Sequence, residues 1–156
     1  MDQRMSKDKY YLNIADAVLD RSTCLRRKYG AIIVKNDEIL STGYNGAPRG
    51  RSNCSELGYC IRDRLNIPSG QRYELCRSVH AEANAITKLA RSSNNSEGAT
   101  LYVTASPCIE CAKLIIQAGI KRVVYGEKYR LDDGLRLLER AGIEVIYLNV
   151  ETSETP

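Results

Sequence analysis

The only histidine in the chain, His80, lies two positions before Glu82 in the stretch SVHAEANAI, and a C-x-x-C pair, Cys108 and Cys111, follows in SPCIEC. One imidazole nitrogen and two thiolates form a ligand set that suits zinc. Three protein ligands leave a fourth position for water, which distinguishes a catalytic zinc from a closed structural one. The sequence therefore predicts a catalytic zinc ion held by His80, Cys108 and Cys111.

Glu82 is the candidate proton carrier at that metal. On a regular helix, residues two apart point about 200° away from each other, so His80 and Glu82 reach one site only if His80 precedes the regular turns. Ser78 is expected to be the N-cap of that helix. Zinc lowers the pKa of a coordinated water to about 7, and a neighbouring carboxylate would accept its proton. A carboxylate that shuttles protons needs a pKa near neutrality, so we predict a buried Glu82.

The C-x-x-C pair is expected at the start of a second helix. Pro107 suits the first helical position, which places Cys108 and Cys111 in the first turn, where the helix dipole favours thiolate. A redox dithiol has the same spacing, but it has no need for an upstream H-x-E. H-x-E followed by P-C-x-x-C is the signature of zinc deaminases of cytosine and adenine, and this combination favours the metal.

The elements that must position these residues alternate between helices and strands. Apolar residues at helical spacing predict a helix over 10–19, and two apolar runs separated by Lys35-Asn36-Asp37 predict a hairpin. The pattern then predicts strands over 30–34, 38–43, 100–104, 122–125 and 143–148, and helices over 80–90, 108–118 and 131–142. Such alternation implies parallel strands covered by helices, an α/β fold.

The length of 156 residues indicates one domain, assigned to residues 1–150, which can bury about 70% of the surface that its unfolded chain exposes. Residues 47–79 lack a clear period and contain three cysteines, and so long an irregular segment is usually functional or cross-linked. The end, 151–156, is predicted to be a disordered tail. No apolar stretch approaches about 18 residues and the start lacks a secretory signal, so we predict a cytoplasmic protein without a membrane partner.

Positive charge gathers in one part of the chain. Residues 21–77 hold eleven Lys and Arg against five Asp and Glu, whereas the net charge of the whole chain is +4. A solvated basic face would explain these residues, and so would a phosphate-bearing ligand, because fixed cations draw anions into a cleft. No dense run of Lys and Arg is present, which favours a small anion over a long nucleic acid.

Four stretches resemble the cytidine deaminase superfamily, and within it the deoxycytidylate (dCMP) deaminases: GYNGAPRG (43–50), HAEANAI (80–86), LYVTASPCIECAKLIIQAGIKRVVY (101–125) and AGIEV (141–145). The late competence proteins of bacteria share this domain and are also similar. The resemblance covers nearly the whole chain except the tails, and it implies a three-layer α/β/α fold with a mixed five-stranded sheet. It further implies hydrolysis of dCMP to dUMP and ammonia, a step that supplies thymidylate precursors, with Glu82 as both acid and base.

The resemblance also implies contacts to the nucleotide substrate. Asn45 matches a family position that touches sugar or phosphate, and Ser106 matches a backbone contact to the base. Tyr129 matches a position that packs near the nucleotide. Ala81, between His80 and Glu82, is a further predicted substrate contact.

The loop GYNGAPRG is the expected place of phosphate recognition, because its glycines allow close backbone approach to a ligand. Arg49 and Arg51 can offer forked donors to phosphate oxygens, and Lys28 is an additional candidate. An ordinary Asn-Gly turn with solvated arginines would give the same pattern. Gly46, Arg51 and Arg91 are candidate contacts to an effector or phosphate, with a surface role as the alternative for Arg91.

The four other cysteines pose a separate question. Cys24 and Cys54 match positions where some relatives bind a second, structural zinc, and Cys60 and Cys76 would complete a four-thiolate set, although relatives often place histidine there. Such a closed site would tie down the long irregular segment and contribute folding stability. The alternative is that these cysteines pack as small apolar residues.

Many relatives are hexamers that dCTP activates and dTTP inhibits, with Mg²⁺ accompanying the triphosphates, and the resemblance extends these expectations to this chain. A tRNA adenosine deaminase or a dCTP deaminase would share the H-x-E and P-C-x-x-C motifs. GYNGAPRG and the absence of a broad basic run favour a mononucleotide. A non-catalytic, competence-linked nucleotide-binding module is the alternative of another class, and Glu82 argues against it because a purely structural zinc has no use for that residue.

Overall fold

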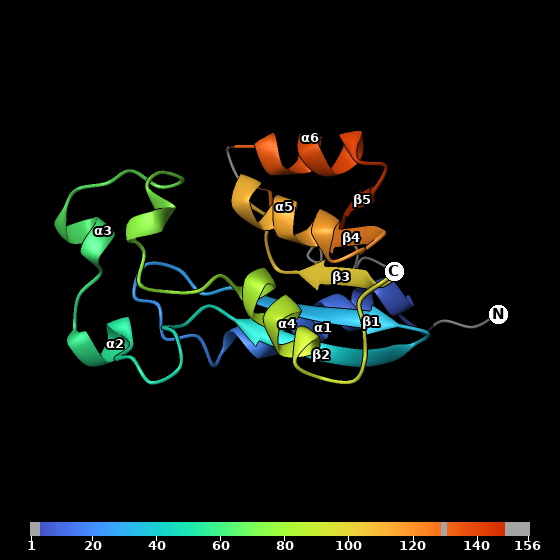
Figure 1. Cartoon of the computed structure of the whole chain (residues 1–156), viewed down its shortest axis with the longest axis horizontal. Helices are drawn as coiled ribbons and strands as arrows, with labels where there is room; N and C mark the ends of the chain where they lie inside the picture. Colours follow the sequence, from blue (N-terminus) through green and yellow to red (C-terminus); the bar gives the residue numbers. More distant parts are fainter. Residues whose placement is uncertain (1–3, 129–130, 149–156) are drawn as a thin grey trace.

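A single mixed sheet of five strands organises the computed structural model, which describes residues 4–128 and 131–148 (Figure 1). The strand order is β2-β1-β3-β4-β5. β1 (Gly30–Lys35) pairs antiparallel with β2 (Glu38–Tyr44) and with β3 (Thr100–Val103), whereas β4 (Arg122–Tyr125) and β5 (Glu144–Tyr147) continue parallel to β3. The predicted α/β class with a mixed five-stranded sheet is confirmed. The predicted tail 151–156 lies outside the described residues.

The β1–β2 hairpin closes through a turn that suits the twist of its strands. Asn36 and Asp37 both adopt positive φ angles, 52° and 62°. A two-residue turn with both central residues in this region matches the right-handed twist of the flanking strands. The predicted hairpin is therefore confirmed.

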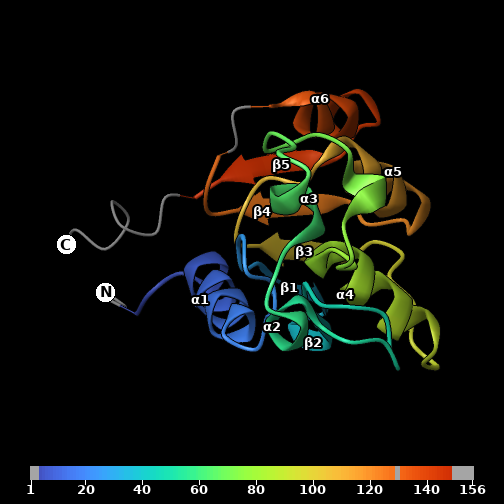
Figure 2. The same ribbon diagram turned by 90° about the vertical axis from the view of Figure 1, so that its left-hand side faces the viewer.

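Helices cover both faces of the sheet, as Figure 2 shows. α1 (Lys7–Leu19) lies on one face, and α4 (Ala81–Ala90), α5 (Ile109–Gln117) and α6 (Asp133–Arg140) lie on the other. Alternate residues of β1 pack on opposite faces of the sheet. Ile32 packs with Leu12 of α1, and Ile33 belongs to the cluster that contains Ile115 of α5. This alternation follows from the two-residue period of a strand.

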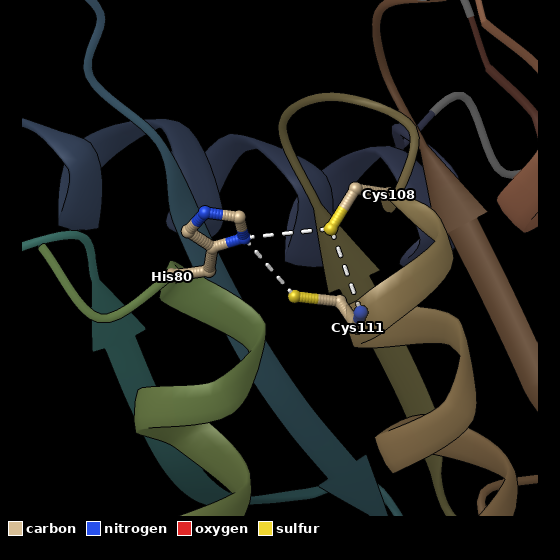
Figure 3. A group of neighbouring side chains, drawn as sticks. All are labelled: His80, Cys108 and Cys111. Atoms are coloured by element: carbon tan, nitrogen blue, oxygen red, sulfur yellow. Dashed lines mark hydrogen bonds between the residues drawn. The ribbon is translucent and has the colours of Figure 1, made fainter. Parts of the chain in front are cut away.

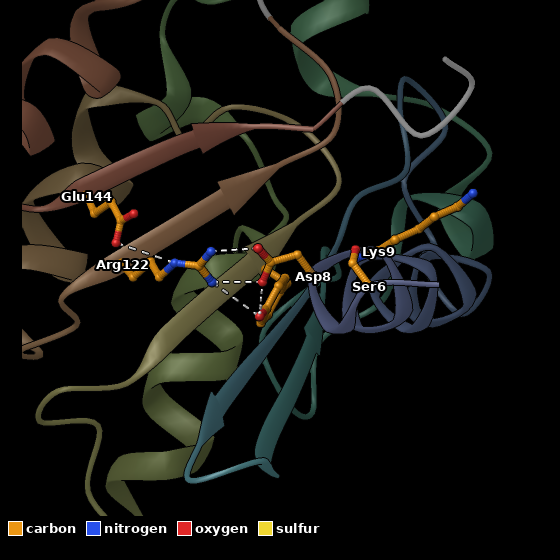
Figure 4. Close-up of polar contacts among 6 residues, drawn as sticks. Ser6, Asp8, Lys9, Arg122 and Glu144 are labelled. Carbon is orange, nitrogen blue, oxygen red and sulfur yellow. Dashed lines mark hydrogen bonds and ion pairs between the residues drawn. The ribbon is translucent and has the colours of Figure 1, made fainter. Parts of the chain in front are cut away.

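An ion pair joins α1 to the middle of the sheet (Figure 4). The guanidinium of Arg122 donates two hydrogen bonds to the carboxylate of Asp8, with N–O distances of 2.8 and 2.6 Å. Tyr102 donates its hydroxyl to the same carboxylate at 2.7 Å, and Glu144 lies 3.5 Å from the Nε of Arg122. These contacts fix the first turn of α1 against β3 and β4.

The long irregular segment projects beyond one end of the sheet, where Figure 1 shows it in green. It contains only short helices: α2 (Cys54–Leu57), α3 (Ile61–Arg64) and the 3₁₀ turn η1 (Tyr73–Leu75). This confirms the prediction that residues 47–79 are largely irregular. Across the described part of the chain, no helix has the length and apolar character needed to cross a membrane.

Candidate functional site

The predicted metal ligands come from two helices that begin at the same edge of the sheet. Strand register places Tyr44 beside Gly30, Ala31 beside Val103, and Val103 beside Tyr125, so β2, β3 and β4 all end at this edge. α4 and α5 start there, next to the irregular segment (Figure 1). The sheet therefore holds two helix starts close together.

His80 occupies the entrance of α4, as the geometry of H-x-E required. It is the N-cap, with the extended angles φ −66° and ψ 154°, and α4 begins at Ala81. The prediction of Ser78 as N-cap is wrong. Val79 exchanges two backbone hydrogen bonds with Gly46, and this bridge keeps the chain extended until His80.

Cys108 occupies the equivalent position at α5. It is the N-cap, and its Sγ accepts the backbone N–H of Cys111 at 3.5 Å. The prediction that Pro107 is the first helical residue is wrong, because the sulfur cap starts α5 at Ile109. Cys111 lies in the first turn, as predicted.

The ligand atoms of the three residues converge, as Figure 3 shows. Nδ1 of His80 lies 3.3 Å from Sγ of Cys111 and 3.5 Å from Sγ of Cys108, and all three atoms lie within 4.8 Å of one another. Tetrahedral zinc with ordinary Zn–N and Zn–S bonds would separate its nitrogen and sulfur ligands by about 3.6 Å. The donor set and its spacing therefore fit zinc.

The thiols and the imidazole interact strongly in this cluster. A hydrogen bond from the Cys111 thiol, followed by contact with His80, lowers the pKa of Cys108 to about 4, whereas the pKa of Cys111 is raised by its bond to Cys108 and by burial. Burial works against the charged form of His80, but its hydrogen bond to Cys108 and the charge of Glu82 raise its pKa. Thiolate is the form that binds metal, so Cys108 is prepared for ligation.

Glu82 is buried beside this cluster. Its side chain is 6% exposed, and desolvation is the main cause that raises its pKa to about 7. The charge of His80 acts in the opposite direction, and Glu82 lines the inner cavity together with His80 and Cys108. The prediction that Glu82 is buried is confirmed, and its raised pKa agrees in direction with the expected proton carrier.

Two adjoining cavities open onto the ligands. The inner cavity, of about 130 Å³, is lined by His80, Glu82 and Cys108. The outer groove, of about 630 Å³, runs between residues 69–74 and the starts of α5 and α6. The two share Tyr73, His80 and Cys108 in their walls. A proton carrier must touch the reacting group, so the inner cavity is the candidate catalytic space.

The predicted substrate contacts fall into two groups. Asn45 and Ser106 are buried and line the inner cavity. Asn45 is also held in place, since its amide donates to the carbonyl of Arg27 and its Oδ1 accepts from the N–H of Tyr29. Ala81 is fully buried as the first residue of α4. Tyr129 lies outside the described residues.

The arginines of GYNGAPRG lie elsewhere. Gly46, Arg49 and Arg51 line a separate basic cavity of about 400 Å³, together with Arg21 and Lys88. Neither His80 nor Glu82 belongs to the lining of this cavity. The prediction that Arg49 and Arg51 contact a phosphate stays a prediction.

Lys28 and Arg91 are exposed, and Arg91 is the C-cap of α4. Neither residue lines one of the three cavities described here. Their predicted ligand contacts also stay predictions.

Several residues of the inner cavity were absent from the sequence prediction: Arg26, Arg27, Tyr29, Arg62 and Tyr73. The excess of positive charge over residues 21–77 pointed to their region of the chain. No motif or period distinguished these arginines from solvated ones.

The four remaining cysteines are neighbours. Burial raises the pKa of Cys54, and the charges of Cys24, Cys60 and Cys76 raise it further. Within the described residues, only His80, Cys108 and Cys111 bring three metal-ligating atoms within 4.8 Å of one another. The thiols of the second set are thus near one another but less tightly converged.

The sequence model of the "Cytidine and deoxycytidylate deaminase zinc-binding region" matches residues 5–127. A deoxycytidylate deaminase of Schizosaccharomyces pombe is 37% identical over 143 residues, which cover 91% of this chain and 44% of the yeast protein. The chain thus spans less than half the length of that relative. A deoxycytidylate deaminase of Mycobacterium phage D29 is 47% identical over 124 residues, which cover 76% of this chain and 92% of the phage protein.

Solved structures agree with this relationship. The crystal structure of dCMP deaminase from the cyanophage S-TIM5, in complex with dCMP and dUMP, has a TM-score of 0.78 and 36% identity. The match covers 94% of this chain and all of the cyanophage chain. With its matched zinc-binding region and its converged His80, Cys108 and Cys111, this chain belongs to the cytidine and deoxycytidylate deaminase family.

Proposed function

We propose that this chain, with residues 1–150 as a single deaminase domain, catalyses the hydrolytic deamination of dCMP to dUMP and ammonia. The observation that carries the proposal is the placement of a buried Glu82 beside three converged metal ligands, at the wall of a cavity. The relatives named deoxycytidylate deaminase, and the cyanophage enzyme bound to dCMP and dUMP, support the choice of substrate.

His80, Cys108 and Cys111 would hold a zinc ion, which supplies a Lewis acid able to generate hydroxide from water at neutral pH. Glu82 accepts the proton of the attacking water and delivers it to the ring nitrogen beside the amine-bearing carbon. Glu82, again a carboxylate, then takes the second proton from the hydroxyl that has added to the ring carbon and delivers it to the departing amine, which leaves as ammonia while the ring carbonyl forms. A pKa of about 7 suits these two transfers, because the group accepts and donates with similar ease near neutral pH.

The residues around Glu82 orient the cytosine ring of the substrate and exclude water from the cavity. Ser106 and Asn45 are buried in the wall of the inner cavity, where they would contact the nucleotide. The ring of Tyr73 meets the ring of His80 edge to face, with centroids 4.8 Å apart, and both residues line the inner cavity. Fixed polar groups of this kind hold the reacting carbon at the nucleophile.

The proposal extends to the assembly and its regulation. We infer a cytoplasmic homo-oligomer, a hexamer, that dCTP activates and dTTP inhibits with Mg²⁺, at a step that supplies thymidylate precursors. The basic cavity supports an anionic effector, because Arg21, Arg49, Arg51 and Lys88 line it. We also infer a second, structural zinc at Cys24, Cys54, Cys60 and Cys76, which the mutual electrostatic influence of these thiols supports.

The test is ammonia release by the zinc-loaded protein from dCMP, dCTP, deoxycytidine and a tRNA anticodon stem-loop. We expect turnover of dCMP that exceeds turnover of the other three. Greater activity on dCTP or on the tRNA substrate would reassign the enzyme, and no release from any substrate would favour a nucleotide-binding module. Addition of dCTP and dTTP to the dCMP assay tests regulation separately.

A further inference from the structure

Arg62 is a buried cation that forms no ion pair with a carboxylate of residues 4–128 or 131–148. It lies in the one-turn helix α3 and is 6% exposed. Its Nε is buried without a hydrogen-bond acceptor, and among the residues that the structure describes no acidic side chain pairs with its guanidinium. The contact that the guanidinium does make is with the ring of Tyr73, whose centroid lies 4.7 Å from its Cζ.

This guanidinium belongs to the wall of the inner cavity, which it shares with Glu82 and Ser106. Tyr73 connects it to the metal ligands, because the same ring packs against His80. Arg26 lines the cavity as well, and its Nη1 is a second buried nitrogen without an acceptor. The other nitrogens of Arg26 are engaged, with Asp63 at 3.3 Å from Nε and the carbonyl of Ile67 at 2.8 Å from Nη2.

Two arginines that line one cavity, each with a buried guanidinium nitrogen that lacks an acceptor, indicate an anion. Arginine stays charged at every physiological pH, so the free-energy cost of burying its charge cannot be avoided by loss of a proton. A buried charge is costly unless it is paired and hydrogen-bonded. The planar fork of donors matches phosphate oxygens better than any other common ligand group except a carboxylate.

We propose that Arg62, assisted by Arg26, binds the 5′-phosphate of the substrate and makes the site selective for a nucleoside monophosphate over the nucleoside. This inference rests on the proposed function, since it names the part of the substrate that these residues recognise. It moves phosphate recognition from Arg49 and Arg51, which line the separate basic cavity, to α3 and the segment before β1. Arg62 is thus a specificity-determining residue, distinct from the ligands and from Glu82.

The experiment compares Arg62→Met with wild type in the zinc-loaded full chain. Methionine keeps an unbranched apolar stem in the buried position and removes the charge. Calorimetric titration measures the binding of dUMP, deoxyuridine and inorganic phosphate, and steady-state kinetics give kcat/KM for dCMP and deoxycytidine. We expect the affinity for dUMP to fall about 100-fold, as for a lost charge-assisted pair of hydrogen bonds, and that for deoxyuridine to change less than about 3-fold.

Arg64→Met is the matched control. Arg64 lies on the same short helix, but it is exposed and stacks on Tyr59 at 3.7 Å from the ring centroid. We expect this variant to bind dUMP as wild type does. Arg62→Lys keeps the charge without the fork, and we expect a loss of dUMP affinity of about 10-fold.

Equal losses for dUMP and deoxyuridine in Arg62→Met would overturn the proposal, and so would an unchanged preference for dUMP. If Arg62→Met does not fold, the same comparison in Arg62→Lys decides, with equal effects on both ligands as the contrary result. The proposed function is judged separately. If Arg62→Met loses dUMP affinity but wild type releases no ammonia from dCMP, the activity alone is refuted. If wild type deaminates dCMP and Arg62→Met does so with the same kcat/KM, the phosphate assignment alone is refuted.

Discussion

Gly43 of β2 lies directly against Ala81, the first residue of α4: a Cβ placed on Gly43 would stand 2.3 Å from the carbonyl oxygen of Ala81. It would also stand 2.5 Å from the backbone nitrogen of Ala85. Backbone atoms cannot turn aside as a side chain can. The absence of a side chain at Gly43 therefore allows the helix start that carries His80 and Glu82 to pack on the sheet.

We predict that Gly43→Ala destabilises the fold by about 3 kcal/mol, the upper part of the range for overpacked sites. The variant should also bind less zinc, because α4 must shift away from β2. Urea unfolding and metal analysis give the two measurements. Gly142→Ala is the control, since that position is open and only its positive φ of 82° is strained, at a cost of about 1 kcal/mol. Equal destabilisation in the two variants would contradict the close-packing argument.

Glu82→Gln should retain zinc and lose turnover. Glutamine preserves the shape of the side chain but cannot take up the proton, and positioned acid–base groups contribute about 10²- to 10⁴-fold to rate. We expect kcat for dCMP to fall at least about 1,000-fold, with the zinc content of wild type. Near-normal deamination by this variant would show that another group moves the proton.

Zinc stoichiometry separates the two cysteine sets. We expect two zinc atoms per wild-type chain, one in Cys111→Ser and one in Cys60→Ser, because each substitution removes one thiolate from a different site. Cys111→Ser should lose activity together with its metal. Cys60→Ser should lose stability first, since a closed thiolate site contributes directly to folding. A single zinc atom in wild type would eliminate the structural site.

The Asp8–Arg122 pair predicts a pH-dependent contribution to stability. The hydrogen bond from Arg122 is the main cause that lowers the pKa of Asp8 below its ordinary value of 3.8. A lowered folded-state pKa stabilises the protein above the unfolded pKa, and this contribution is lost as the pH falls through the folded pKa. We expect Asp8→Asn to cost about 1–2 kcal/mol at pH 7, because Arg122 and Tyr102 lose an acceptor, and to cost less at pH 3.

Urea unfolding of wild type and Asp8→Asn at pH 7, 5 and 3 provides the test. Glu110→Gln serves as comparison, because Glu110 and Lys113 form an exposed pair whose removal costs about 0.3 kcal/mol. A deficit in Asp8→Asn that stays constant down to pH 3 would exclude the ion pair as its source.

The convergence of His80, Cys108 and Cys111 was predictable because short-range geometry constrains it. His80 and Glu82 would point about 200° apart on a regular helix, so they can share a site only if one of them precedes the regular turns. The structure shows this arrangement, with His80 as the N-cap of α4. The caps were less predictable. Ser78 lost its expected role to a backbone bridge between Val79 and Gly46, a contact between distant segments that local sequence does not encode.

The residues that line the cavities were harder to predict than the three residues that converge at the helix starts. The role of Arg49 was inferred from its position in GYNGAPRG, and the structure places it in a cavity separate from Glu82. Arg62 carried no signal, because burial of one charge depends on how an irregular segment folds over the sheet rather than on periodicity. Tyr73 likewise follows no pattern, and only the folded chain brings its ring against His80.

The irregular segment 47–79, green in Figure 1, affects how the ligand preference of this fold can change by mutation. The helix starts and the sheet beneath them position Glu82 and the three converged ligand residues, whereas Arg62 and Tyr73 belong to a segment that packs beyond the strand ends. Exchanging Arg62 and its exposed neighbours in this segment, with Tyr73 and the three cysteines kept, would alter which ligands bind and leave His80, Glu82, Cys108 and Cys111 in place. In this proposal, the residues that select the ligand and the residues that carry out the reaction belong to different segments and can change independently.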